Sequence, residues 1–297
     1  MNHDSLAELS GVSKRFGKVV ALDNFELQVR PAELLAVLGP NGAGKSTAIA
    51  LMLGLRPPDS GNARLFGDSP TNVASRRRIG IMMQEVTLAP ELKVHEHIDL
   101  VASYYPDPLS ADEAMALTGT AALASRPYGK LSSGQKRQMQ FAMAIVGRPD
   151  LLFLDEPTVG LDIRSRELMW AALRDFVHKG VSIVLTTHYL EEAESLSDRV
   201  VVLAKGRAIA SGTVNELRGL VDRKRISCVT SLSPDAIAAW PGVQAVCHDR
   251  GRLRITATNA EVVVKQLVST GVDFQELEVH RAGLAEAFTE LTQEVAL

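Results

Sequence analysis

The segment GPNGAGKST at residues 39–47 constrains the fold of this chain more than any other part of its sequence. It fits the pattern GxxxxGK[ST], which marks a phosphate-binding loop when a strand precedes it and a helix follows. The apolar run ELLAVLG leads directly into the segment, and TAIALMLGL, from residue 47, has the apolar density of a helix start before the turn-forming residues PPDSG. The alternative is a glycine-rich turn with a chance lysine, which would not require these neighbours. The sequence therefore predicts a strand, a phosphate-binding loop and a helix in succession.

The residues of this loop suit the binding of a nucleotide. Glycines allow backbone N–H groups to close around phosphates, and the N-terminus of the following helix adds a favourable dipole. We expect Lys45 to reach the β- and γ-phosphates of ATP and the Ser46 hydroxyl to bind Mg²⁺. The predicted nucleotide-binding residues are Gly39, Pro40, Asn41, Gly42, Ala43, Gly44, Lys45, Ser46 and Thr47.

Two adjacent acids end the apolar strand LLFLDEP at residues 151–157. A phosphate-loop enzyme needs one carboxylate for its metal ion and another to activate water. On its own, an Asp-Glu-Pro sequence after a strand is more often a solvated turn, but the phosphate loop earlier in the chain reverses that preference. We expect Asp155 to hold Mg²⁺ through a water molecule and Glu156 to act as the base. The two motifs together indicate nucleotide hydrolysis.

Short apolar strands alternate with helical segments in the first two thirds of the chain. VSIVLTTH at residues 181–188 is a further strand, and a helix is predicted before it at about residues 165–179. The segment from about residue 85 to residue 124 is richer in helix formers. This alternation indicates an α/β fold with a mainly parallel sheet, covered on both faces, that binds ligands at the carboxyl ends of its strands.

A second, smaller domain is predicted after a basic stretch near residue 220, which divides the chain into residues 1–220 and 221–297. The second part is predicted to contain a strand, a helix, two strands joined by a turn, a helix, a strand and a last helix over GLAEAFTELTQ. This order indicates a small α+β domain with an accessory or regulatory role. Its two cysteines, Cys228 and Cys247, lack CxxC spacing and are expected to be reduced thiols.

The charge balance gives no support for a general attraction to nucleic acid. The chain has 32 basic and 35 acidic residues, so its net field would draw in neither nucleic acid nor an anionic membrane. It has no long apolar run of the kind that spans a bilayer, and MNHDSLAELS lacks the features of a signal peptide. We therefore expect a cytoplasmic protein without a transmembrane segment.

The segment LSSGQKRQ at residues 131–138 decides which kind of nucleotide hydrolase the chain resembles. It is similar to the signature LSGGQ of the ABC-type ATPases, with a serine in place of the first glycine. Further matches occur in the order typical of that family. They are Phe16 at the position of the adenine-stacking aromatic, Gln84 in the glutamine loop, Asp162 in the D-loop GLD and His188 as the switch histidine.

The resemblance implies a fold and a dimer. The fold would be that of an ABC-type phosphate-loop NTPase with an antiparallel β subdomain and a helical subdomain at about residues 85–147. The signature residues Ser132, Ser133, Gly134 and Gln135 would face the phosphates of the other subunit, so that each ATP site is shared. Within one chain, the same residues are also expected to cap a helix. A side chain at Ser133, where the family has glycine, would alter geometry or affinity there.

The other matched residues have roles implied by the resemblance and alternatives that need no ligand. Gln84 would reach toward Mg²⁺ and the attacking water, or it is only an exposed polar residue. His188 would bond to the γ-phosphate, or it is a surface or capping residue. Phe16 would stack on adenine, or it belongs to the core. Asp162 would belong to the D-loop of the family.

Within the family, the chain resembles the ATPases of ABC-2 type exporters, on the segments VGLDIRSRELMW and TTHYLEEAESLSDRV and a C-terminal extension ending in LAEAFTEL. That resemblance implies a homodimer, or a heterodimer with a similar subunit, which drives a separate membrane permease from the inner face of the membrane. No nucleic-acid partner is expected. The alternative is a soluble ABC-type ATPase that acts on nucleic acid or ribosomes.

Overall fold

The computed structural model describes residues 5–219, 224–249, 251–281, 284 and 288. The chain forms two compact units, residues 1–214 and 215–297. The boundary predicted near residue 220 falls within residues 220–223, outside the described residues, as does most of the predicted last helix.

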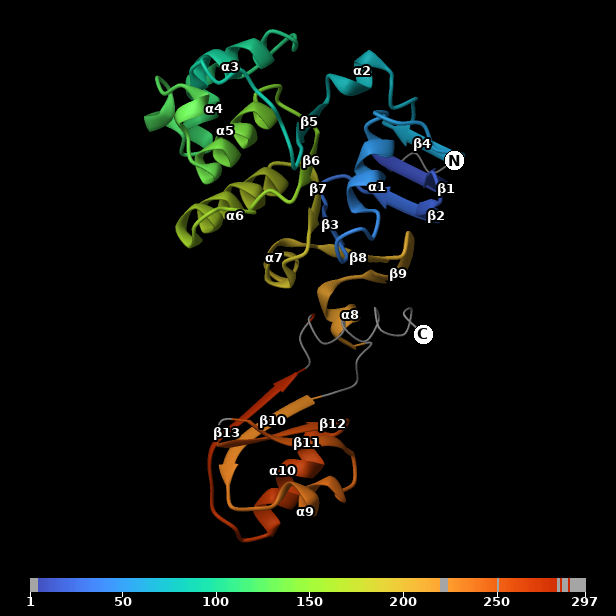
Figure 1. Ribbon diagram of the computed structural model, residues 1–297, viewed down its shortest axis with the longest axis vertical. Helices are drawn as coiled ribbons and strands as arrows, with labels where there is room; N and C mark the ends of the chain where they lie inside the picture. The colour runs from blue at the N-terminus through green and yellow to red at the C-terminus, as the bar shows by residue number, and fades with distance from the viewer. Residues whose placement is uncertain (1–4, 220–223, 250, 282–283, 285–287, 289–297) are drawn as a thin grey trace. The chain divides into compact units, whose positions relative to one another are not determined.

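A six-stranded sheet is the centre of the first unit (Figure 1). In spatial order its strands are β5 (Ile79–Met82), β6 (Leu151–Asp155), β7 (Ser182–Thr187), β3 (Leu34–Leu38), β8 (Arg199–Ala204) and β9 (Arg207–Gly212). Neighbouring strands are parallel, except that β9 is antiparallel to β8. Every residue of β3, β6 and β7 is buried, as in a parallel sheet covered on both faces. The predicted sheet is confirmed.

Alternate residues of β6 enter two different cores. Leu151 and Phe153 belong to a core shared with α1 (Lys45–Met52) and with the antiparallel sheet. Leu152 and Leu154 belong to a second core. The second core also includes residues of α5 (Ser133–Ile145), α6 (Ile163–His178) and α7 (Leu190–Leu196). Figure 1 shows α1 beside β1 and β2, with α5 and α6 across the sheet from it.

The antiparallel sheet has the order β2-β1-β4. Its strands are β1 (Ala7–Phe16), β2 (Val19–Val29) and β4 (Ser60–Leu65). The inward side chains of β1 and β2 alternate with exposed ones and pack in the same core as α1. This sheet is the predicted antiparallel β subdomain.

A group of helices lies between β5 and β6 in the sequence. Its elements are α3 (Val94–Ala102), α4 (Ala111–Leu117), two short 3-10 turns, η1 (Ala121–Leu123) and η2 (Tyr128–Lys130), and α5. The short α2 (Val73–Arg76) precedes β5. Helix α5 approaches β5 closely, because a Cβ atom at Gly80 would lie 1.9 Å from the carbonyl oxygen of Ala144. Only glycine fits at this crossing.

The second unit is the predicted α+β domain. The short α8 (Val214–Gly219) leads into β10 (Lys224–Thr230), α9 (Pro234–Ala238), β11 (Val243–Asp249), β12 (Arg252–Ala257), α10 (Ala260–Ser269) and β13 (Phe274–Arg281). The strand order β11-β12-β10-β13, all antiparallel, is that of a ferredoxin-like βαββαβ unit. Its core consists of apolar residues from β10, β12, α9 and α10. Both cysteines are free.

Within the described part of the chain, every helix is too short or too polar to cross a bilayer.

The contact at Gly80 predicts a large effect of a small substitution. Gly80→Ala would push a methyl group against the α5 backbone, and overpacking of this kind costs about 1–3 kcal/mol. We expect the melting temperature, followed by circular dichroism, to fall by several degrees. Gly219→Ala is the control, because a Cβ there would meet no atom within 4 Å. Equal melting temperatures for the two variants would contradict the close packing of α5 on β5.

Candidate active site

The phosphate-binding loop joins β3 to α1, as predicted. Gly44 is the N-cap of α1 and has a φ of 114°, a conformation that side chains disfavour. A Cβ atom at this position would also lie 2.4 Å from the carbonyl oxygen of Ala21. The chain therefore needs glycine where the loop turns into the helix. Ser46 is exposed in the first turn of α1.

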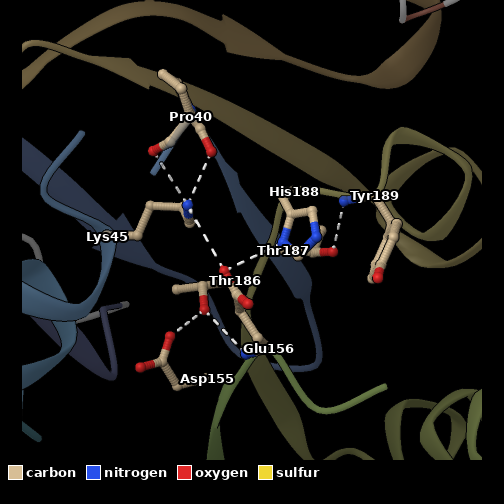
Figure 2. Close-up of polar contacts among 9 residues, drawn as sticks. Pro40, Lys45, Asp155, Glu156, Thr186, Thr187, His188 and Tyr189 are labelled. Carbon is tan, nitrogen blue, oxygen red and sulfur yellow. Dashed lines mark hydrogen bonds and ion pairs between the residues drawn. The ribbon is translucent and has the colours of Figure 1, made fainter. Parts of the chain in front are cut away.

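The side chain of Lys45 folds back over the loop (Figure 2). Its Nζ atom donates hydrogen bonds to the carbonyl oxygens of Gly39, at 2.8 Å, and Pro40, at 3.3 Å. Burial lowers the pKa of Lys45, and the negative charges of Glu156 and Asp155 oppose that shift. A cation is thus held inside the loop that the sequence predicts to bind phosphates.

The ends of three neighbouring strands meet at this loop. In the register of the parallel sheet, Leu38 at the end of β3 pairs with Thr187, and Asp155 at the end of β6 pairs with Thr186. Glu156 and His188 are the residues that follow β6 and β7. The carboxyl edge of the sheet therefore brings these predicted residues to Lys45, in the position where α/β proteins bind ligands.

The Glu156 carboxylate lies between two basic side chains (Figure 2). Its Oε1 atom is 3.2 Å from Nδ1 of His188 and 3.8 Å from Nζ of Lys45. Glu156 is 7% exposed, and its φ is 49°, which is uncommon for a residue with a side chain. Its N–H donates to both the carbonyl oxygen and Oγ1 of Thr186, at 3.1 Å each. These contacts fix the direction in which the carboxylate points.

Thr186 is a site residue that the sequence analysis missed. Its hydroxyl donates to Oδ1 of Asp155 and accepts from the N–H of Glu156, so one side chain orients both acids. Thr186 and Asp155 are both almost completely buried. The signal in the sequence was the pair of threonines at the end of VSIVLTTH, beside the histidine that was singled out.

The segment that resembles the ABC signature begins α5 and caps it. The Ser132 hydroxyl accepts from the N–H of Gln135, at 3.2 Å, and Oε1 of Gln135 accepts from the N–H of Ser132, at 3.1 Å. This reciprocal pair is a capping box, so the predicted helix cap is confirmed. Ser132 and Ser133 are exposed at the start of a helix of 13 residues.

The signature segment packs against the GLD segment that follows the two acids. A Cβ atom on Gly134 would lie 3.2 Å from the carbonyl oxygen of Gly160, and a Cβ on Gly160 would lie 3.5 Å from Oγ of Ser133. Asp162 is the N-cap of α6, and its carboxylate accepts a hydrogen bond from the N–H of Ser165 at 2.8 Å. This bond and a second one from the Ser165 hydroxyl lower the pKa of Asp162. In this chain, the Ser133 side chain thus faces the GLD segment.

Gln84 and Phe16 are both exposed residues. Gln84 lies two residues after β5, and within the described part of the chain no hydrogen bond or ion pair joins it to Lys45, Asp155 or Glu156. Phe16 ends β1 and is 42% exposed, with the Arg56 guanidinium 5.4 Å from its ring centroid. The alternative that Phe16 is a core residue is therefore wrong, and adenine stacking stays a prediction.

Arg137 connects the signature helix to the glutamine loop and was not singled out from the sequence. Its guanidinium donates to the carbonyl oxygen of Met83, at 2.8 Å, and to Oε1 of Gln140, at 3.2 Å. Burial lowers the pKa of Arg137, and the charges of Asp155 and Glu156 oppose that shift. A buried cation on α5 thus fixes the backbone immediately before Gln84 and lies within the field of the two acids.

Comparisons with known proteins agree with these motifs. The family described as ABC transporter matches residues 22–159. The Nod factor export ATP-binding protein I of Burkholderia thailandensis is 42% identical over 215 residues, which cover 69% of this chain and 70% of that protein. The daunorubicin resistance ATP-binding protein DrrA3 of Streptomyces coeruleorubidus is 34% identical over 305 residues, which cover 97% of this chain and 96% of that protein.

Solved structures show the same fold. An ATP binding subunit of an ABC transporter superposes with a TM-score of 0.67 at 28% identity, covering 73% of this chain and 93% of that one. The dimeric structure of MJ0796, a bacterial ABC transporter cassette, gives a TM-score of 0.64 at 25% identity, covering 70% and 98%. Both alignments leave about a quarter or more of this chain unmatched, whereas the alignment with DrrA3 extends over almost all of it.

The hydrogen bonds of Thr186 predict a specific loss of turnover. Thr186→Val keeps the shape of the side chain and removes the hydroxyl that orients Asp155 and Glu156, so we expect ATP affinity to change little and kcat to fall about tenfold or more. Thr120→Val, which also removes a buried hydroxyl but far along the chain from either acid, is the control for lost stability. Equal kcat values in the two variants would remove the role given to Thr186.

Proposed function

This chain belongs to the ABC transporter family as an ATP-binding, ATP-hydrolysing subunit of the exporter type, and from that membership and the site geometry we propose how it uses ATP. The observation that carries the proposal is the meeting of Lys45, Glu156 and His188 at the carboxyl edge of the parallel sheet. A cation inside a phosphate loop, a fixed carboxylate and a histidine are the groups that phosphoryl transfer to water requires.

When ATP binds, its phosphates replace contacts that Lys45 and His188 make with other groups of the protein. Backbone N–H groups of residues 39–47 enclose the phosphates, and Lys45 turns from the carbonyl oxygens of Gly39 and Pro40 to the β- and γ-phosphates. The γ-phosphate also accepts a hydrogen bond from His188. Glu156 is then left to orient the attacking water and to take its proton.

Magnesium fits the oxygen donors at this site. Mg²⁺ binds through one or two carboxylates together with waters and substrate phosphates, and it needs no cage of protein ligands. The Ser46 hydroxyl, exposed on the first turn of α1, and the Asp155 carboxylate, through water, are the groups that would hold it, with Gln84 contributing from the glutamine loop. When bound, the ion neutralises negative charge on the phosphates.

Each ATP site is completed by a second subunit in head-to-tail order. The N-terminus of α5 supports this step, because Ser132 and Ser133 are exposed there and the N–H groups of a helix start bind anions. The partner's phosphate loop brings the γ-phosphate to this signature segment. A dimeric cassette among the similar solved structures supports the formation of a dimer.

Closure of the dimer on ATP and its reopening after hydrolysis drive a separate membrane permease. The γ-phosphate is the differential contact, since only the closed dimer binds it from both sides. The named functions of the relatives, Nod factor export and daunorubicin resistance, support outward transport over an action on nucleic acid or ribosomes. The subunit would then work at the inner face of the membrane.

The test of this function is the variant Glu156→Gln in the full chain. The amide keeps the shape of the side chain but cannot take a proton, so we expect ATP binding to persist and turnover to fall about 10²-fold or more. The variant should also trap an ATP-bound dimer, visible by size-exclusion chromatography with bound nucleotide counted.

Glu167→Gln, an exposed carboxylate on α6, is the matched control and should hydrolyse ATP at the normal rate. Normal hydrolysis by Glu156→Gln would show that another group is the base. Failure of the unaltered chain to bind Mg-ATP would contradict the proposed site as a whole.

A further inference from the structure

A buried carboxyl group that the proposed chemistry does not use lies directly behind the active site. Glu192 is the third residue of α7, four positions after His188, and its side chain is 0% exposed. Acidic residues are rarely buried to this degree unless they are paired. The groups around Glu192 therefore bear on what it does.

Helix α6 provides a hydrogen bond that fixes the carboxyl. Nε1 of Trp170 donates to Oε1 of Glu192 at 3.1 Å, and both side chains are buried. The Arg166 guanidinium lies 5.1 Å from the Trp170 ring centroid, and its positive charge favours the ionised form of Glu192. Helix α6 begins immediately after Asp162, so Glu192 is tied to the helix that follows the GLD segment.

Two threonine hydroxyls from the catalytic loops complete the surroundings. Burial raises the pKa of Glu192, and the hydroxyls of Thr187 and Thr158 oppose that shift from nearby, as does Trp170. In the described part of the chain, Oε2 of Glu192 and Oγ1 of Thr158 are each buried without a partner at hydrogen-bonding geometry. An unsatisfied buried oxygen is costly, so a small movement that joined these two atoms would be favourable.

The two threonines are close in the sequence to the proposed catalytic residues. Thr158 comes two residues after Glu156, and Thr187 comes immediately before His188. Trp170 belongs to α6. Glu192 thus accepts a hydrogen bond from the helix that follows the GLD segment and lies near two threonines, one beside Glu156 and one beside His188 in the sequence.

We propose that Glu192 is a positioning residue that holds the loops of Glu156 and His188 in register with α6, through its hydrogen bond from Trp170 and through the Thr187 and Thr158 hydroxyls beside it. The inference rests on the proposed roles of Glu156 and His188. It adds a buried carboxyl group that sets the separation of Glu156 and His188. This carboxyl accepts a hydrogen bond from Trp170 and can donate a hydrogen bond to the Thr158 hydroxyl or accept one from it. The part that Glu192 plays requires hydrogen-bonding shape and does not require a negative charge.

This proposal distinguishes Glu192→Gln from Glu192→Leu in the full chain. The amide can still accept from Trp170 and donate to Thr158, so we expect kcat to stay within about twofold of the unaltered value. Leucine fills a similar volume but can form a hydrogen bond with neither Trp170 nor Thr158. For Glu192→Leu we expect kcat to fall about tenfold to a hundredfold, with the Kd for ATP nearly unchanged because the phosphate loop is intact.

A second variant keeps the test valid if Glu192→Leu does not fold. Trp170→Phe removes the Nε1 donor and keeps an aromatic ring, and it should lower kcat in the same direction by a smaller factor. Where Glu192→Leu folds, its effect on kcat and that of Trp170→Phe should be non-additive, since each substitution removes the same hydrogen bond. Glu167→Gln, an exposed carboxylate on α6, is the control and should leave kcat unchanged.

The outcomes separate positioning from a purely structural role. A fall in kcat with constant Kd for ATP, rescued by glutamine, supports the proposal. Equal kcat in Glu192→Leu and the unaltered protein would overturn it, as would a parallel loss of kcat and of ATP affinity that follows the folded fraction. Additive effects of Glu192→Leu and Trp170→Phe would also overturn it. Normal turnover by Glu156→Gln, measured alongside, would instead contradict the underlying assignment of the base.

Discussion

The contact of one buried carboxylate with two basic side chains is the constraint on which the site depends. Glu156 is held against Lys45 and His188, and a buried charge is tolerated only with such partners. Glu156 and His188 follow β6 and β7, and Lys45 begins the helix reached by the loop after β3, so the contact exists only if the sheet order β6-β7-β3 is correct. Thr186 then fixes the unusual backbone of Glu156 and the direction of Asp155. The order of the strands therefore determines the geometry of the candidate active site.

The surrounding helices are connected to this site by buried contacts. Helix α5 crosses β5 at Gly80, and Arg137 fixes the backbone before Gln84, so the signature helix and the glutamine loop are packed as one piece. Across the same edge, Glu192 of α7 accepts a hydrogen bond from α6 and lies near threonines that neighbour Glu156 and His188 in the sequence. The segments that we propose to face a partner subunit or a permease are thus connected to the acids by buried polar groups. Such contacts have strict geometry, which suits a site that must change state with its ligand.

The sequence predicted what is local and missed what depends on pairing. Lys45, Ser46, Asp155 and Glu156 lie within short motifs whose chemistry follows from adjacent residues, and the structure places the lysine and both acids at one edge of the sheet. Thr186 was missed because its importance arises from its register with Asp155 on another strand. The order β11-β12-β10-β13 in the second unit is equally non-local, although its strands and helices were predicted. The motif pattern also could not show that Glu192, among three nearby acids in LEEAE, is the buried one.

Mixed dimers can test whether each ATP site is shared between two subunits. Lys45→Ala disables the phosphate loop, and Ser132→Arg obstructs the signature, so a mixed dimer has both defects in one site and leaves the other intact. In a Glu156→Gln background, with the two chains carrying different tags, we expect about one trapped ATP per mixed dimer and little in either mutant homodimer, because only the mixed dimer has one complete γ-phosphate site. No more ATP in the mixed dimers than in the homodimers would show that each site lies within one chain.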